Sequence, residues 1–295
     1  MGMSKPDFHG ININRIKQSS KKLSGNILST PTIFAHSLSD LLESSLYLKL
    51  ENLQFTSSFK SRGAFIALQE LDEKNKKIGV ITMSAGNHAQ AVAFRSQQQG
   101  IKSIIVMPEK TPFTKISKTK AYGAEIILTG RTLDEAKLTV ERLINENGFQ
   151  LVHPFDDPHI ITGQGTIGLE IMEEVPNLDY LVIPIGGGGL ISGISIAAKS
   201  INPDIKIIGV ESELYPSMSR SLAGLNLQSG GDTLAEGIAV KTPGELTKPI
   251  VKELVDKIIL VNEQQIEWAI SALIEHQSII AEGAGAAGLA AIYAS

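Results

Sequence analysis

Four consecutive glycines, Gly186, Gly187, Gly188 and Gly189, are followed by Leu190 and an alanine-rich helical pattern. They come directly after an apolar run at 180–185, so they occupy a strand-to-helix turn. Without Cβ atoms, successive N–H groups can point into one concavity, and the helix N-terminus adds the positive end of its dipole. This turn is therefore predicted to bind a phosphate. A simple packing turn is the alternative, but it would not require four glycines, which cost backbone entropy.

Two common phosphate-binding motifs are absent from the sequence. No placement of the glycines gives the spacing of the dinucleotide-binding fingerprint, and no Gly-Lys-Ser or Gly-Lys-Thr of a Walker loop occurs. The phosphate is therefore expected to belong to another cofactor.

Lys60 lies between small hydroxyl residues and beside Phe59, where a helix is expected to begin. The positive end of a helix disfavours the ammonium form, so this amine could have a lowered pKa and act as a nucleophile. The alternative is a solvated lysine preceded by two N-capping residues, Ser57 and Ser58. Ser57-x-x-Lys60 also matches the acylating motif of penicillin-recognising enzymes, but the Ser-Asp-Asn and Lys-Thr-Gly that accompany it are absent.

The segment Ser84-Ala85-Gly86-Asn87-His88 again follows a predicted strand and precedes a helical pattern. Its small residues leave backbone N–H groups open to a carboxylate, and the Asn87 amide can donate to a phenolic or carbonyl oxygen. A lone histidine at a helix start is more often structural than catalytic, so His88 is not assigned as a base.

Short runs rich in Ile and Val alternate with longer helical patterns, which predicts an α/β fold with parallel strands. A crossing between two lobes is predicted at 145–158, and a ligand would bind in the cleft between the lobes. The predicted strands are 46–50, 79–83, 103–107, 125–128, 180–185, 206–210 and 257–261.

Composition narrows the class of protein. The 295 residues carry a net charge of −4, with no basic cluster suited to nucleic acid or anionic lipid. The chain has no cysteine, which excludes disulfides and thiolate sites and fits the cytoplasm. No signal peptide is expected near the start, and the uncharged stretches 181–198 and 283–295 are interpreted as buried core rather than membrane spans.

Together these segments resemble the fold type II pyridoxal-phosphate enzymes, specifically the threonine dehydratase (threonine ammonia-lyase) and serine racemase family. The likeness spans nearly the whole chain and is greatest to the bacterial threonine dehydratases. Further segments that resemble the family are those at 153–158, 163–170, 209–211, 233–237 and 282–285.

The resemblance implies roles for individual residues. Lys60 would form the Schiff base with pyridoxal 5'-phosphate and later take the Cα proton, Phe59 would pack against the ring and Asn87 would face the ring hydroxyl. The phosphate would lie against Gly186 to Gly189 and Leu190. The residues implied to bind the substrate are Ser84, Ala85, Gly86, Asn87, His88, Glu236 and Gly237, with Ser84 also given a catalytic role.

The resemblance also implies a fold and a reaction. The fold would be that of tryptophan synthase β: a larger cofactor-binding lobe from 1–50 and 151–295, and a smaller mobile lobe from 51–150. The reaction would be α,β-elimination, which converts L-threonine to 2-oxobutanoate and ammonia. The protein would act on a small amino acid as a homo-oligomer, a dimer or a tetramer, with no nucleic acid or membrane partner.

Two alternatives for the substrate and reaction stay open: serine dehydratase or racemase, and 3-hydroxyaspartate ammonia-lyase. Racemisation needs a protic group on each face of the Cα carbanion, and family racemases have a second serine where this chain has Ala85, which favours the dehydratase. Some family members bind a divalent cation near the equivalent of Glu211, but Glu213 is offset and Ser217 replaces the expected aspartate, so no metal is assigned.

A third alternative is a catalytically silent ligand-binding or regulatory paralogue, or a fragment. In the family, the segment that begins at Glu282 is followed by a further strand and a Gly-rich turn, whose Ser or Cys hydrogen-bonds the pyridine nitrogen. This sequence stops at Ser295, before that turn.

Overall fold

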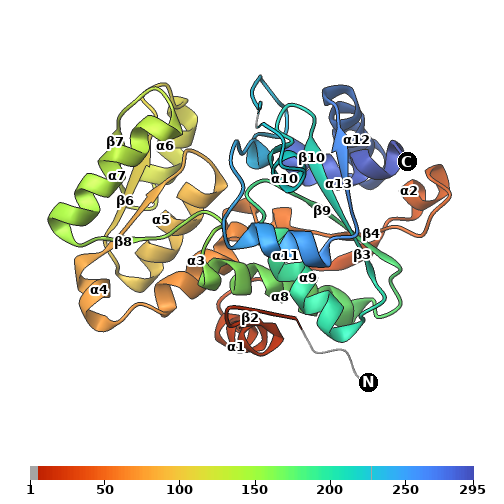
Figure 1. The fold of residues 1–295 in the computed structure, drawn as a ribbon, viewed down its shortest axis with the longest axis horizontal. Helices are drawn as coiled ribbons and strands as arrows, with labels where there is room; N and C mark the ends of the chain where they lie inside the picture. Colours follow the sequence, from red (N-terminus) through yellow and green to blue (C-terminus); the bar gives the residue numbers. More distant parts are fainter. Residues whose placement is uncertain (1–5, 227) are drawn as a thin grey trace.

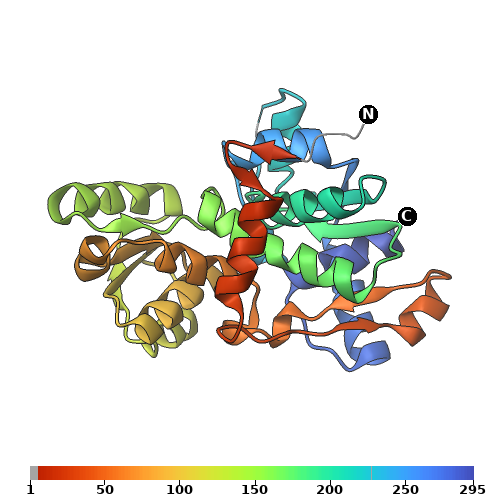
Figure 2. The same cartoon turned by 90° about the horizontal axis from the view of Figure 1, so that it is seen from below.

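The computed structural model describes residues 6–226 and 228–295, which form two lobes side by side (Figures 1 and 2). The first lobe contains a parallel four-stranded sheet in the order β7-β6-β5-β8. Its strands are β5 (Val80–Met83), β6 (Ser103–Met107), β7 (Glu125–Leu128) and β8 (Gln150–Leu151).

Helices cover both faces of this sheet because its strands are apolar on both sides. Val80 and Ile105 belong to the core under α3 and α5, whereas Ile81 and Ile104 belong to the core under α7. Successive strand side chains point to opposite faces, so each strand contributes to both cores. The helices of this region are α3 (Lys60–Gln69), α4 (Glu73–Ile78), α5 (Asn87–Gln99), α6 (Phe113–Lys120) and α7 (Leu133–Asn147).

The second lobe contains a parallel three-stranded sheet in the order β11-β10-β9. Its strands are β9 (Tyr180–Pro184), β10 (Lys206–Ser212) and β11 (Lys257–Val261). One face packs on α8, α9 and α11, and the other packs on α12 and α13. The helices are α8 (Pro158–Glu174), α9 (Gly189–Ile201), α10 (Ser217–Leu222), α11 (Thr247–Leu254), α12 (Glu263–Gln277) and α13 (Gly283–Tyr293), with a 3-10 turn η3 (Glu236–Ile238).

The N-terminal elements pack on the second lobe. Helix α1 (Ile13–Leu23) contacts α8 and α9, and α2 (His36–Leu41) contacts α12. Strands β3 (Thr32–Phe34) and β4 (Tyr47–Lys49) form an antiparallel pair. The remaining elements are β1 (Asp7–Phe8), β2 (Ile11–Asn12) and two 3-10 turns before α3, η1 (Glu51–Leu53) and η2 (Phe55–Ser57).

The predicted α/β class and all seven predicted strands are confirmed. The bounds of β6, β7 and β11 agree residue for residue; β5, β9 and β10 differ by one or two residues at one end, and β4 is one residue shorter at each end. Strands β1, β2, β3 and β8 were not predicted. The stretches 181–198 and 283–295 form β9 with α9 and α13, and no helix in the described part of the chain is long and apolar enough to span a membrane.

The crossing between the lobes is shorter than predicted. Helix α7 and strand β8 occupy most of 145–151, which leaves 152–157 as the connection to α8. Asp157 ends it as the N-cap of α8, because its carboxylate accepts from the N–H groups of His159 and Ile160, with Pro158 in the first turn. The lobe boundaries at 51 and 150, and the mobility of the smaller lobe, stay predictions.

Candidate active site

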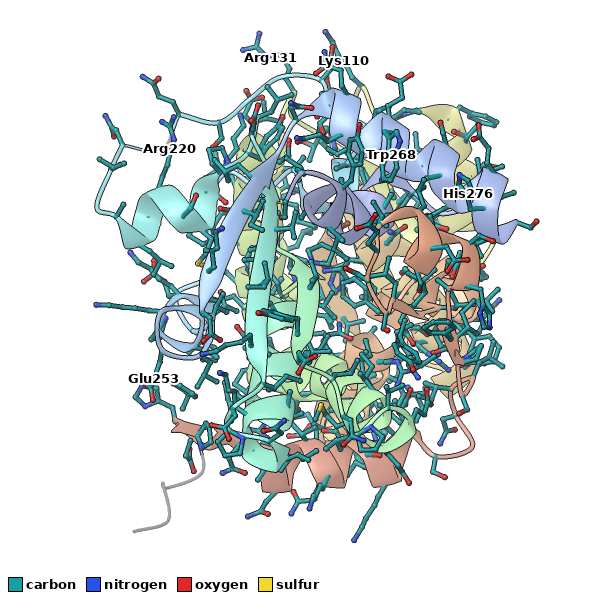
Figure 3. All side chains as sticks on the ribbon, turned by 90° about the vertical axis from the view of Figure 1, so that its right-hand side faces the viewer. Lys110, Arg131, Arg220, Glu253, Trp268 and His276 are labelled. Atoms are coloured by element: carbon teal, nitrogen blue, oxygen red, sulfur yellow. The ribbon has the colours of Figure 1, made fainter. Side chains whose placement is uncertain are left out.

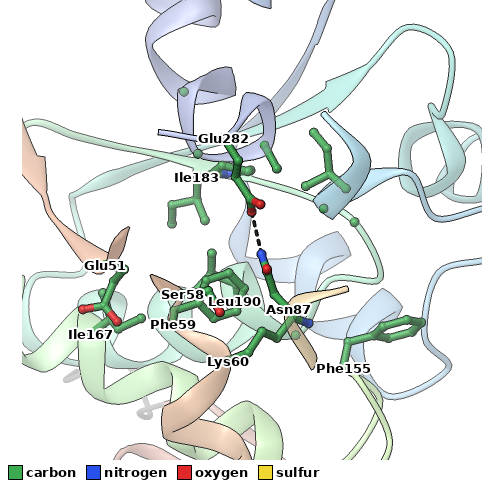
Figure 4. Close-up of a pocket in the computed structure, with 18 of the residues that line it drawn as sticks. Glu51, Ser58, Phe59, Lys60, Asn87, Phe155, Ile167, Ile183, Leu190 and Glu282 are labelled. Atoms are coloured by element: carbon green, nitrogen blue, oxygen red, sulfur yellow. Dashed lines mark hydrogen bonds between the residues drawn. The ribbon is translucent and has the colours of Figure 1, made fainter. Parts of the chain in front are cut away.

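One cavity of about 2860 Å³ brings together the predicted site residues (Figure 4). It is lined by the start of α3, the turn after β5 and the loop after β9. The carboxyl ends of parallel strands are where α/β sheets bind ligands, so this placement fits a binding site. The predicted residues that line it are Phe59, Lys60, Ser84, Ala85, Gly86, Asn87, His88, Gly186, Gly187, Gly188, Gly189, Leu190, Glu236 and Gly237.

Lys60 is the first residue of α3, and its Nζ donates a hydrogen bond of 2.7 Å to the carbonyl oxygen of Pro154. Lys60 lines the cavity and is partly exposed to it. Burial lowers the pKa of this amine to about 8, while the charge of Glu282 opposes the shift. The lowered pKa predicted from the sequence therefore has burial as its main cause.

The serines before Lys60 do not cap its helix. The N-cap position is Phe59, which makes no side-chain capping bond, and the buried hydroxyl of Ser58 has no hydrogen-bond partner in the described part of the chain. Thr56 and Ser57 have φ of 59° and 54°, in the left-handed region that non-glycine residues rarely adopt. Two strained residues thus precede the lysine.

The turn after β5 is open to the cavity. The hydroxyl oxygen of Ser84 accepts from the N–H of Gly86 at 3.2 Å, which leaves its hydrogen free to donate. A Cβ added at Gly86 would meet no atom within 4 Å. Asn87, the first residue of α5, donates from Nδ2 to Glu282 Oε1 at 2.7 Å (Figure 4). That it faces a ring hydroxyl stays a prediction.

His88 is buried and held as a neutral ring. Its Nε2 lies 2.9 Å from the carbonyl oxygen of Val152, and because a carbonyl only accepts, Nε2 carries the proton. Burial, and next the charge of Lys60, lowers its pKa to about 3. This ring stays uncharged at neutral pH, which agrees with leaving it out of the proton transfers.

The glycine loop presents unpaired backbone donors. The N–H groups of residues 186–191 donate to no acceptor within residues 6–226 and 228–295. Residues 186–190 line the cavity in succession and end in the first turn of α9, an arrangement that suits the binding of an anion.

Phe155 explains why side chains are excluded from this loop. A Cβ at Gly187 would lie 2.2 Å from the Phe155 ring, and one at Gly189 would lie 2.8 Å from its carbonyl oxygen. Gly188 has φ of +95°, where other residues are strained. The loop can therefore approach a ligand only through its backbone.

Several site residues were not predicted. Glu282 accepts from Asn87 across the cavity, and burial raises its pKa. Lys115 on α6 forms an ion pair with Glu236, a second contact between the lobes. Pro154 and Phe155 contact Lys60 and the glycine loop. The sequence signals were the family-like segments at 153–158 and 282–285, without an indication of these contacts.

Glu211, near which some family members bind a cation, contacts the backbone at the start of α10. Its buried carboxylate accepts from the N–H groups of Met218 and Ser219 at 2.7 and 2.9 Å, at the start of α10. Burial raises its pKa. In the described part of the chain, no group of three or more His, Asp or Glu residues is arranged to hold a metal ion.

The cofactor implied by the sequence needs an amine for its aldehyde and a cradle for its phosphate. The cavity offers both: the amine of Lys60, with its lowered pKa, and the unpaired N–H groups of the loop. The residues present therefore fit pyridoxal phosphate.

Comparisons with known proteins agree with this geometry. The family described as pyridoxal-phosphate dependent enzyme matches residues 23–295. The L-threonine ammonia-lyase of Thermotoga maritima is 48% identical over 284 residues, which cover 96% of this chain and 71% of that protein. The processed form of threonine deaminase isoform 2 from Solanum lycopersicum superposes with a TM-score of 0.91 at 37% identity, covering 98% of this chain and 81% of that one. Serine racemase from Dictyostelium discoideum gives 0.89 at 40% identity, covering 95% and 91%. The predicted resemblance is confirmed: this chain belongs to the family of pyridoxal-phosphate dependent enzymes.

Proposed function

We propose that this chain is a threonine ammonia-lyase, which converts L-threonine to 2-oxobutanoate and ammonia. The observation that carries the proposal is the placement of one reactive amine, one anion cradle and one carboxylate-binding turn in a single cavity. The names of its relatives support the same substrate, since proteins called L-threonine ammonia-lyase and L-threonine dehydratase are 45–48% identical to it.

Phe59, Lys60 and Asn87 would hold the ring of the cofactor, and Gly186 to Gly189 with Leu190 would hold its phosphate. When bound, pyridoxal phosphate supplies an aldehyde for the substrate amine and an electron sink for the pair left at Cα. The protein's part is to position both reactants and to move the protons.

Lys60 is the base in this proposal. At a pKa of about 8, a substantial fraction of the amine is neutral near physiological pH, as proton abstraction requires. An ordinary lysine, with a pKa near 10.4, would be almost fully protonated there. Pro154 keeps the amine in place through its carbonyl oxygen.

The turn from Ser84 to His88 would bind the substrate carboxylate through backbone N–H groups at the start of α5. The Ser84 hydroxyl, which accepts from Gly86, has its hydrogen left to donate to the same carboxylate. Glu236 and Gly237, on the opposite side of the cavity, would contact the substrate side chain.

Ala85 favours elimination over racemisation. Racemisation needs a second protic group at the Cα carbanion, and a methyl side chain has none. Serine racemase remains the second candidate, because a racemase is 40% identical to this chain. Interconversion of D- and L-serine at a rate comparable to elimination would contradict the proposal.

We further propose that the protein works in the cytoplasm as a homo-oligomer, and that the smaller lobe moves as ligands bind. The absence of cysteine supports the compartment. The Asn87–Glu282 and Lys115–Glu236 contacts would hold the lobes in their closed position. Light scattering after gel filtration tests the oligomer.

The direct test is the visible absorption spectrum of the 295-residue protein with pyridoxal phosphate, before and after addition of L-threonine, with 2-oxobutanoate assayed in the same cuvette. A yellow species that shifts and yields the oxo acid supports the proposal. L-serine and threo-3-hydroxyaspartate, tested in parallel, distinguish the alternative lyases. A folded protein that stays colourless would favour the silent paralogue.

A further inference from the structure

The carbonyl oxygen of Gly187 is held by a segment of the second lobe that lies outside the glycine loop. Thr247 Oγ1 donates to it at 2.6 Å, and the N–H of Gly244 donates to it at 3.1 Å. Thr247 begins α11 and is fully buried. A carbonyl oxygen has two lone pairs, so both are engaged.

This contact determines where the next N–H group points. In a trans peptide unit, the C=O of one residue and the N–H of the next point in opposite directions. Fixing the Gly187 carbonyl toward 244–247 therefore turns the Gly188 N–H away from that segment and leaves it free for an anion. Thr247 also packs against the loop, because a Cβ at Gly188 would lie 2.7 Å from Oγ1.

Asp156 holds the segment that carries Thr247. Its two carboxylate oxygens accept from the N–H groups of Glu245 and Leu246, at 3.0 and 2.9 Å. Asp156 belongs to the crossing between the lobes, one residue after Phe155, which packs against the glycine loop, and two after Pro154, which binds Lys60. The crossing between the lobes thus contacts both Lys60 and the glycine loop.

We propose that Thr247 and Asp156 are positioning residues that orient the phosphate loop and thereby make the protein select pyridoxal phosphate over pyridoxal, which lacks the phosphate. Neither side chain contacts the cofactor in this role. The inference rests on cofactor binding at the proposed site, but not on the identity of the amino-acid substrate.

The test compares the affinity of the apoprotein for pyridoxal phosphate and for pyridoxal by absorption titration. Thr247→Val keeps the shape of the side chain and removes the donor. We expect it to weaken binding of pyridoxal phosphate about ten-fold, which corresponds to about 1.4 kcal/mol, and to leave pyridoxal binding unchanged. The ³¹P resonance of the bound cofactor should shift, and Thr247→Ser should restore both values.

Substitutions of Asp156 test the same inference, because Asp156 holds the segment that carries Thr247. Asp156→Ala removes both acceptors and should weaken phosphate binding at least as much as Thr247→Val, whereas Asp156→Asn, which keeps one acceptor oxygen, should have a smaller effect. Combining Asp156→Ala with Thr247→Val should add little to the larger single effect. Ser195→Ala is the matched control, because the buried Ser195 hydroxyl on α9 has no partner in the described part of the chain.

The inference is overturned if Thr247→Val weakens both ligands equally, if Thr247→Ser behaves like valine, or if the parent protein binds pyridoxal as tightly as its phosphate. Should Thr247→Val fail to fold, the two Asp156 variants test the inference through the same comparison, the affinity for pyridoxal phosphate relative to that for pyridoxal. A protein that shows the expected ratios but does not convert L-threonine would contradict the proposed function and leave this inference standing.

Discussion

Two strand-to-helix turns form opposite sides of the cavity, and they are built in opposite ways. The turn between β5 and α5 has side chains with hydrogen-bonding groups at Ser84, Asn87 and His88. The loop between β9 and α9 has none over Gly186 to Gly189 and offers only backbone. The position in the fold is the same, so local sequence and packing decide what each turn can bind.

The two turns also differ in the space around their glycines. A methyl group at Gly86 would enter the open cavity, whereas one at Gly187 would overlap the Phe155 ring. In the proposed function, the first turn would receive the substrate and the second would hold the phosphate of the cofactor. Substitutions in the two turns should then change different measured quantities.

The largest effect is expected from Lys60→Ala. Loss of the amine should lower kcat for L-threonine at least about 10³-fold, because a general base contributes about 10²–10⁴-fold. The urea midpoint should stay close to that of the parent protein, since the amine makes one hydrogen bond, worth about 1 kcal/mol. Steady-state kinetics measures kcat, and urea unfolding measures the midpoint. Retained activity would remove Lys60 from the mechanism.

Gly187→Ala should act on stability and cofactor affinity together. The added methyl must displace the Phe155 ring, and overpacking of this kind costs about 1–3 kcal/mol. Urea unfolding of the apoprotein and titration with pyridoxal phosphate measure the two effects. An unchanged variant would mean that the loop is not closely packed, and the contrast between the two turns would fail.

His88→Gln tests whether the buried His88 ring, in the turn after β5, makes the free energy of unfolding depend on pH. Between pH 6.5 and about 3 the unfolded chain binds a proton at this ring that the folded chain does not, so the free energy of unfolding falls as pH falls. From pH 7 to 5 this amounts to about 2 kcal/mol, which the variant should lose.

The control for that experiment is His276→Gln. His276 is exposed on α12 (Figure 3) and does not line the cavity. Its replacement should leave the difference in urea stability between pH 7 and pH 5 as it is in the parent. An equal change in both variants would show that burial of His88 is not the cause.

The smallest effect is expected from Gly86→Ala. Its methyl group would occupy space in which the substrate carboxylate is expected, so KM for L-threonine should rise about ten-fold, or about 1.4 kcal/mol. Stability should change by less than about 1 kcal/mol, because no atom lies within 4 Å. A loss of stability as large as that of Gly187→Ala would show that the two turns do not differ in packing.

The sequence was sufficient for the parts of the fold with strong periodicity. Strands β6, β7 and β11 are apolar runs bounded by polar residues, and they were predicted correctly. Strand β8 has two residues, too few for any alternation to appear. Strand β4 was predicted but its partner β3 was not, because the two pair across α2 and a local pattern does not contain such contacts.

The site was predicted as residue types more than as contacts. The glycine run and the lysine carry their chemistry in their own sequence neighbourhoods. Glu282 meets Asn87 over a separation of 195 residues, and Thr247 meets Gly187 over 60, so only the folded chain brings them together. For Lys60 the lowered pKa was expected, but its cause, burial beneath the crossing, is a tertiary effect.

The two lobes differ in how much of the chain each core needs, and this sets an order for folding during synthesis. The cores on both sides of the first sheet draw on residues 64–160. The core beneath α13 joins Ala35 and Leu38 to residues as late as Ala291. Domains tend to fold as soon as their residues have left the ribosome. The smaller lobe should therefore be assembled before the second lobe has left the ribosome, and the cavity should close only after α13 has been added.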